Sequence, residues 1–246
     1  MTASSRILPT DFVLHQVQAS AFAAEDAFRP SSILAEVLRD WPDVYNGELL
    51  SIPLPQDVPM EVPSVIVPSQ DESLRLQAAR ARVDLFWYQR DGLHVEIEET
   101  LNTFADRLAT ICEKNEVTVG RLAAVVTRRT RIPNPGRILA QQFCRDEWLD
   151  GPLNRPERFE LHAHKTFHLL TDLRVNSWVR IRTTQKAGDE GGQYIGIQQD
   201  MNTLAEELAG SSFPRPKMMS FFEAVGKEFG TIFELYFPST QRDQEA

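Results

Sequence analysis

One stretch in the middle of the chain, Val65 to Glu116, limits what the rest can fold into. Its second half carries apolar side chains at alternating steps of four and three residues, namely Ile97, Leu101, Phe104, Leu108, Ile111 and Cys112. This spacing keeps the whole set on one side of an α-helix. We therefore predict an amphipathic helix over residues 97–113 that covers one face of a sheet.

The sheet is expected to begin with a hairpin directly before this helix. Residues 74–78 and 83–88 each alternate apolar side chains with others, which places one set on each face of a strand. Residues 79–82 would form the turn between them. The second strand carries aromatic side chains on both faces, which favours a place inside the sheet rather than at its edge.

The rest of the chain alternates similar signals. Strands are expected at residues 12–24, 119–132, 159–170, 174–184 and 194–201, and helices at residues 31–41, 135–143 and 216–236. Four prolines stiffen the connector at residues 46–63, which is either an extended linker or a ligand for a proline-binding module. Residues 146–156 and 186–192 are expected to be loops, and residues 204–213 hold a helical turn.

This order of elements indicates an α+β fold, in which a mainly antiparallel sheet has helices packed on one face. A chain of 246 residues can bury a large core, and we expect a single globular domain over residues 1–246. The pattern suggests two related halves, residues 1–116 and 117–246, each a strand meander closed by a long helix. Residues 239–246 would form a flexible tail.

Composition narrows the setting of the protein. The two cysteines, Cys112 and Cys144, are expected to be buried thiols without a bridge, as in a reducing compartment. No apolar run is long enough for a signal peptide or a membrane span, so we expect a cytoplasmic protein. The formal charge of −9 argues against a general nucleic-acid coat protein, although a local basic site is compatible with it.

Four segments carry a resemblance to a known family. They are the proline-rich connector before VIVPSQDESLRLQ, the segment VGRLAAVVTRRTRIPNP, the strand YIGIQQDMN and the closing helix FFEAVGKEFGTIFELYF. Together they resemble a sporadically distributed, uncharacterised family of bacterial proteins of about this length. Members usually carry LGLRYIN-like and LDID-like strands where this chain has AVVTRRTRI and IGIQQDM. The resemblance implies the order of elements and a bacterial origin, and no catalytic residues.

Two groups of side chains could bind a ligand. His162 and His164 share a face of one strand, at a spacing that can chelate a metal ion, whereas His168 is too far along the strand to join them. The alternative for these histidines is a half-exposed polar strand face. The second group is an arginine set with one indole, made of Arg128, Arg129, Arg131, Trp178, Arg180 and Arg182.

The arginine set would form a basic patch if its two strands are neighbours. Guanidinium groups beside an indole suit a phosphate, a nucleotide or a single-stranded nucleic acid. Cross-strand pairing with carboxylates such as Asp84 and Glu160 is the structural alternative. We take this set as the candidate ligand site.

No phosphate-binding or nucleophile motif occurs in the sequence. We therefore expect a non-enzymatic interaction protein with a protein partner, such as an accessory or defence-associated component in a bacterium. No catalytic residue, metal ligand or cofactor is assigned. The alternatives are a nucleotide or nucleic-acid binding module that uses the arginine set, and a metal-dependent hydrolase that uses His162 and His164.

Overall fold

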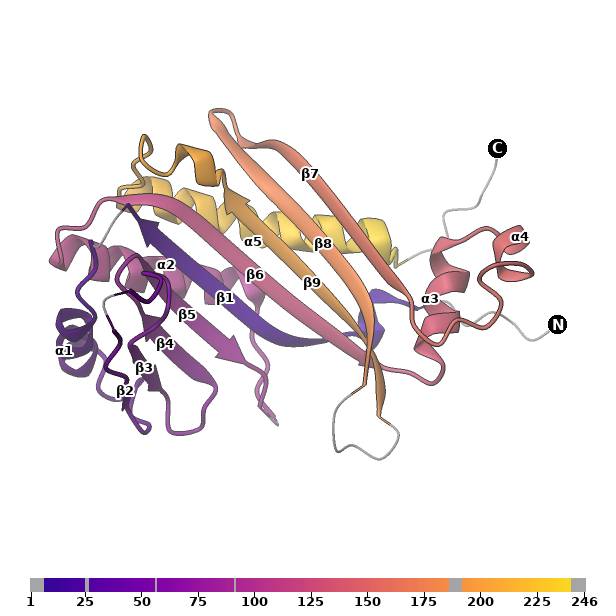
Figure 1. Cartoon of the computed structure of the whole chain (residues 1–246), viewed down its shortest axis with the longest axis horizontal. Coiled ribbons are helices and arrows are strands. Elements are labelled where there is room, and N and C mark those ends of the chain that lie inside the picture. Colours follow the sequence, from indigo (N-terminus) through magenta and orange to yellow (C-terminus); the bar gives the residue numbers. More distant parts are fainter. Residues whose placement is uncertain (1–6, 25–26, 56, 91, 186–191, 240–246) are drawn as a thin grey trace.

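The computed structural model describes residues 7–24, 27–55, 57–90, 92–185 and 192–239. These residues form one antiparallel sheet with the strand order β2-β3-β4-β5-β1-β6-β9-β8-β7 (Figure 1). Helices α2 and α5 lie behind the sheet in Figure 1, and α1 lies beside them at one end. The fold class is therefore α+β with helices on one face of the sheet, as predicted.

The strands and helices follow the predicted order, with small additions. The strands are β1 (Val13–Ala23), β2 (Leu50–Ser51), β3 (Val65–Pro68), β4 (Leu74–Ala78), β5 (Arg82–Tyr88), β6 (Val119–Arg131), β7 (Glu160–Leu170), β8 (Leu173–Gln185) and β9 (Gln193–Thr203). The helices are α1 (Pro30–Asp40), α2 (Ile97–Lys114), α3 (Pro135–Phe143), α4 (Asp146–Leu149) and α5 (Arg215–Tyr236), with short 3-10 turns η1 (Pro9–Asp11) and η2 (Ala205–Glu207).

The two halves of the chain follow the same path through the sheet. In the first half the strands lie side by side as β3-β4-β5-β1, and in the second half as β7-β8-β9-β6. The halves meet where β1 pairs antiparallel with β6, in a register that runs from Val13 opposite Arg129 to Ala23 opposite Val119. Each half ends in a long helix, α2 or α5. The division into halves at residue 116 stays a prediction, because β1 and β6 hold both parts in one continuous sheet.

The predicted central helix is α2, and its apolar stripe is buried. Leu101, Phe104 and Leu108 are all at most 1% exposed, because they face β1, β5 and α5. We expected this helix to pack on the β4–β5 hairpin. Its actual position is shifted toward the middle of the sheet, where β1 has paired with β5. Such long-range pairing is not visible in a local pattern.

Helix α5 lies against α2, and glycine allows the close approach. A Cβ built on Gly226 would lie 3.0 Å from Cγ and 3.2 Å from Cα of Glu98, so the two helices touch through a backbone without a side chain. Gly230, one turn later, is exposed and has no neighbour within 4 Å of such an atom. Of the two glycines expected to permit close packing, only Gly226 does so.

Three short elements were missed by sequence reasoning. Strand β2 lies inside the proline-rich connector, β3 follows it, and α4 lies inside the expected loop 146–156. All are too short for a periodic pattern, and β3 is defined by its pairing with β4. The predicted turn at 186–192 and the tail at 239–246 lie outside the described residues, apart from Gly192 and Ser239.

The cysteines are free thiols, as expected. Cys112 is buried on α2, and burial raises the pKa of its thiol to about 12. Cys144 follows α3 and is only half-buried, so its environment differs from the buried one predicted. A search of the described residues finds no helix with the length and apolar character needed to cross a membrane.

Candidate functional site

The two faces of the sheet have different chemistry. Val17, Ala19 and Ala21 of β1 belong to the buried core under the helices. Gln16, Gln18, Ser20 and Phe22 alternate with them, so their side chains lie on the opposite face. Figure 1 looks onto this opposite face, with α2 and α5 behind the sheet. We call it the uncovered face.

Strand register places a set of arginines on the uncovered face. Residues opposite one another in neighbouring strands share a face, and following the pairs from β4 to β7 identifies the members. The arginines are Arg75, Arg82, Arg121, Arg129, Arg131, Arg174, Arg180 and Arg182. The carboxylates on the same strands and face are Asp84, Asp200 and Glu160. Over the described strands this face is therefore basic, although the whole chain is acidic.

Aromatic rings on this face are each joined to an arginine. The Tyr88 cluster lies on β4 and β5, where the Arg75 guanidinium carbon is 5.0 Å from the Tyr88 ring and Phe86 stacks on that ring at 5.7 Å. Guanidinium groups are attracted to the negative faces of aromatic rings. The cluster therefore holds a positive charge above an apolar surface.

The Phe22 cluster lies at the middle of the sheet, where β5, β1 and β6 run side by side. Phe22 is paired with Arg82 on one side and Arg121 on the other. The guanidinium carbons of these arginines lie 5.1 and 4.7 Å from the ring centre. Because both arginines belong to the strands that flank Phe22, the register itself builds this arrangement.

The Trp178 cluster lies near the other edge, on β8 and β7. The His164 ring stacks on Trp178 with a centroid distance of 4.0 Å and an interplanar angle of 19°. The Arg180 guanidinium carbon lies 5.3 Å from the same indole. His164 is also fixed by Asn176, whose Oδ1 is 3.2 Å from the His164 Nε2. Arginine and aromatic side chains are thus interleaved over three separate places on one face.

The centre of this face is hollowed. A depression of about 500 Å³ lies over β5, β1, β6 and β9, and it is walled by Glu61 of the connector and by Ala205 and Leu208 beside η2. Polar groups form its floor, including Gln18, Arg82, Arg121, Asp200 and Asn202. Burial lowers the pKa of the Arg121 guanidinium, which is half-buried there.

A buried carboxylate organises part of this floor. Asp84 accepts hydrogen bonds from the Ser20 hydroxyl and from Gln18 Nε2, the latter at 3.1 Å. The Arg82 Nε lies 2.6 Å from Asp84 Oδ2. Arg121 donates to Asn202 Oδ1 at 3.1 Å and to the Thr203 carbonyl at 3.3 Å. These two arginines are therefore held in place by neighbouring groups.

The structure separates the predicted arginine set. Arg129, Arg131, Arg180, Arg182 and Trp178 all lie on the uncovered face. The strands β6 and β8 that carry them are not neighbours, because β9 runs between them. Gly196 of β9 lies opposite both Arg129 and Arg182, so no side chain lies between these two arginines.

Arg128 does not share this face. It is 8% exposed and lies on the helix-covered side, where it donates to Gln199 Oε1 and its guanidinium carbon is 4.3 Å from the Phe233 ring. Burial lowers the pKa of Arg128 to about 10. Its position follows from alternation, since Leu122, Ala124 and Val126 of the same strand also face the core.

The histidines lie on the edge strand β7. His162 and His164 share the uncovered face, as expected, and the His162 Nε2 is 3.7 Å from Glu160 Oε2. Among the described residues no group of three or more histidine, cysteine, aspartate or glutamate side chains could hold a metal ion. In this part of the chain, His164 is instead engaged with Trp178 and Asn176.

Sequence reasoning missed several members of this face, namely Phe22, Arg75, Arg82, Tyr88 and Arg121. The alternation of polar residues in β1 does place Phe22 on the polar side. Their clustering depends on which strands pair, and that is not visible in a single sequence. The clearest available signal was an aromatic residue at a polar position of a strand.

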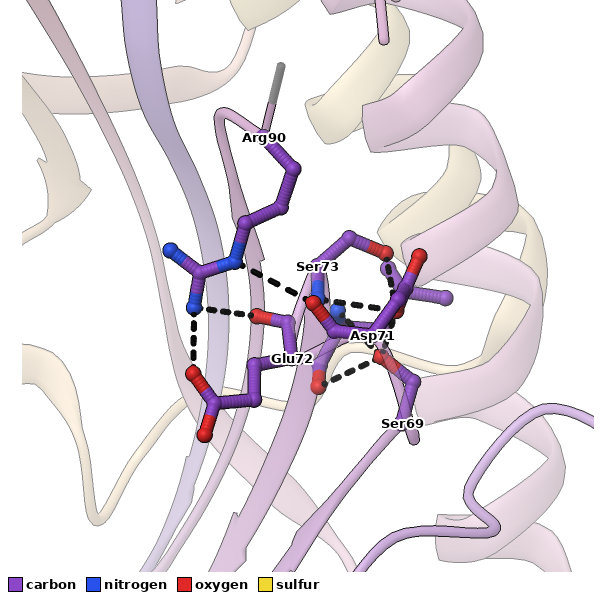
Figure 2. A network of polar contacts seen from close by, with 6 residues as sticks. Ser69, Asp71, Glu72, Ser73 and Arg90 are labelled. Carbon is purple, nitrogen blue, oxygen red and sulfur yellow. Dashed lines mark hydrogen bonds and ion pairs between the residues drawn. The ribbon is translucent and has the colours of Figure 1, made fainter. Parts of the chain in front are cut away.

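A second polar network lies away from this face, in the β3–β4 turn (Figure 2). Asp71 Oδ1 accepts hydrogen bonds from the Ser69 hydroxyl at 2.5 Å, the Ser73 hydroxyl at 2.8 Å and the Ser73 amide at 3.0 Å. The side-chain bond from Ser69 and the amide of Ser73 lower the pKa of Asp71. Arg90 binds the Glu72 carboxylate at 2.8 Å, and Glu72 has a positive φ of 56°. This network fixes the conformation of the turn.

Comparisons with known proteins return no match: no protein-family model fits the chain, and no curated protein is similar to it in sequence. The resemblance to a sporadically distributed bacterial family therefore stays a prediction.

Proposed function

We propose that this chain is a non-enzymatic interaction protein that binds an anionic partner on the uncovered face, and that this partner is a single-stranded nucleic acid. The observation that carries the proposal is the interleaving of arginine and aromatic side chains in the Tyr88, Phe22 and Trp178 clusters. Cationic groups along a surface attract a phosphate backbone, and rings and guanidinium planes are platforms on which bases stack.

The distribution of charge favours an anionic ligand at this face. The chain has a formal charge of −9, whereas the described strands concentrate arginines on one side of the sheet. Such a separation attracts an anion to the basic side and orients its approach. Salt bridges on the helix side, such as Arg215 with Glu113 at 2.9 Å, show that basic groups there are neutralised locally.

The rings favour a nucleic acid over an acidic protein surface. An acidic surface needs only cations, and rings on the same face would be exposed for no purpose. From β5 to β8 the face spans four strand spacings, or roughly 19 Å, which accommodates several nucleotides. The contacts are to flat surfaces and charges, so we expect little dependence on base sequence.

The test is a binding titration of fluorescently labelled oligothymidine at low ionic strength. Wild type should bind well below the roughly millimolar range, and its affinity should fall as salt rises because counterions are released. The Arg180→Ala/Arg182→Ala variant and the Trp178→Ala variant should each bind more weakly. A double variant of Arg137 and Lys217, both to Ala, is the matched control, because it removes the same charge from α3 and α5.

Absence of oligothymidine binding by wild type at low salt would overturn the proposal, as would equal losses in the test and control variants. A polyglutamate peptide is titrated in parallel. Tighter binding of that peptide than of oligothymidine would assign the face to an acidic protein partner instead.

A further inference from the structure

The further inference concerns Arg129 and Arg182, and it rests on the proposed function. Strand register aligns Arg129 of β6, Gly196 of β9 and Arg182 of β8 in one row across the uncovered face. The two arginines are separated by two strand spacings, or roughly 10 Å between backbones. The middle position has no side chain, so the row has a cation at each end and a gap between them.

The arginines in this row lack the neutralising contacts found elsewhere. Arg82 has Asp84, Arg90 has Glu72 and Arg215 has two carboxylates. Among the described residues, by contrast, Arg129 and Arg182 have no ion pair or hydrogen bond from their side chains. Glu160 lies opposite Arg182 in the register, and its carboxylate is the one 3.7 Å from His162.

The two charges are close enough to affect each other. Burial lowers the pKa of Arg129, and the positive charge of Arg182 lowers it further. Two like charges held near one another without a counter-ion raise the free energy of the folded protein. A bound anion between them would convert this repulsion into attraction.

The glycine between them is not required by the fold. Gly196 has no positive φ, since the described glycine with that conformation is Gly92. A Cβ at Gly196 would lie 3.9 Å from the Arg182 carbonyl oxygen and 3.9 Å from Thr184 Cγ2, which is ordinary contact. Glycine inside a strand costs stability and often marks close approach of a ligand. Here it leaves open the space between two guanidinium groups.

We infer that Arg129 and Arg182 clamp one phosphate group of the ligand over Gly196. Guanidinium groups donate paired hydrogen bonds that match the oxygens of a phosphate, and two of them on opposite sides can share one tetrahedral anion. Arg131, in the next row of β6 and also exposed, would receive the neighbouring phosphate of a strand that runs along β6.

Two substitutions at Gly196 test the clamp with the arginines left in place. Gly196→Ala adds a methyl group that the space accepts, whereas Gly196→Glu adds a carboxylate between the two cations. Equal melting temperatures of the two variants show that both fold. Inorganic phosphate is titrated into each ¹⁵N-labelled protein at low salt, and amide shifts of residues 129, 182 and 196 are followed. Wild type and Gly196→Ala should show saturable shifts, and Gly196→Glu and Arg129→Ala should not.

Oligothymidine binding is measured with the same variants. Gly196→Glu should bind about tenfold more weakly than Gly196→Ala, because one charge-assisted contact is lost. Equal oligothymidine affinities of these two variants, with binding by wild type intact, would overturn the clamp and leave the proposed function standing. Phosphate-induced shifts that Gly196→Glu abolishes, in a protein that binds no oligothymidine, would support the clamp and reject nucleic acid as the ligand.

Discussion

Gly226 of α5 lies against Glu98 of α2 at a distance that leaves no room for a larger residue. The matched position is Gly230, which is exposed on the same helix. We predict that Gly226→Leu lowers the free energy of unfolding by about 1–3 kcal/mol, because the added side chain forces the helices apart. Gly230→Leu should instead raise it by up to about 1 kcal/mol through helix propensity. Urea denaturation of the two variants measures both changes, and a similar effect of the two substitutions would contradict the close packing of α5 on α2.

The β3–β4 turn yields a prediction about acid sensitivity. The pKa of Asp71 is lowered by the Ser69 hydroxyl and the Ser73 amide, from an ordinary value of 3.8. A carboxyl group whose pKa is lower in the folded state stabilises the fold above the unfolded pKa. That contribution is lost as pH falls through the folded pKa. Carbon-detected NMR should show Asp71 titrating below pH 3.8, and Ser69→Ala should move its midpoint upward. No shift in the Ser69→Ala variant would show that the hydrogen bond in Figure 2 does not hold the carboxylate.

The order of elements was predictable because helical and strand periods are local. The stripe on α2 needed only the positions of Leu101, Phe104 and Leu108. The composition of the uncovered face was not predictable, because it depends on β9 lying between β6 and β8 and on β1 joining the two halves. Arg128 shows where local reasoning could have gone further. Alternation with Leu122 and Val126 already indicates the core side, although a run of arginines suggests one exposed group.

The two thiols should differ in reactivity. Cys112 is 5% exposed and has a pKa raised to about 12, so almost none of it is thiolate near neutral pH. Burial also raises the pKa of Cys144, which is nonetheless half-buried and accessible. A thiol-specific chromogenic reagent at pH 8 should label one cysteine quickly in the native protein and the second only after unfolding. The Cys144→Ser variant should lose the fast phase, and persistence of that phase would place Cys112 at the surface.

Asp84 couples stability to ligand binding in opposite directions. It accepts bonds from Ser20, Gln18 and Arg82, and its side chain is 7% exposed. Replacement by Asn removes the negative charge and disrupts the network, which should cost about 1–3 kcal/mol in the free energy of unfolding. The same change removes the counter-ion of Arg82, so oligothymidine should bind more tightly at low salt. Weaker binding by a folded Asp84→Asn protein would argue against a role for the Phe22 cluster in holding an anion.

Adjacent arginines of β6 allow the two faces of the sheet to be tested separately. Arg128 lies on the helix-covered side with Gln199 and Phe233, and Arg129 is exposed on the uncovered face. Arg128→Ala should lower the free energy of unfolding by about 1–3 kcal/mol, because it leaves the Gln199 carbonyl oxygen without its donor and opens a gap beside Phe233. Its affinity for oligothymidine should stay at the wild-type value. Arg129→Ala should change stability little, since its side chain has no hydrogen bond or ion pair among the described residues, and should weaken oligothymidine binding and its dependence on salt. Urea denaturation and salt-dependent titrations of both variants decide the matter. Loss of binding in Arg128→Ala with no loss in Arg129→Ala would move the ligand site off the uncovered face.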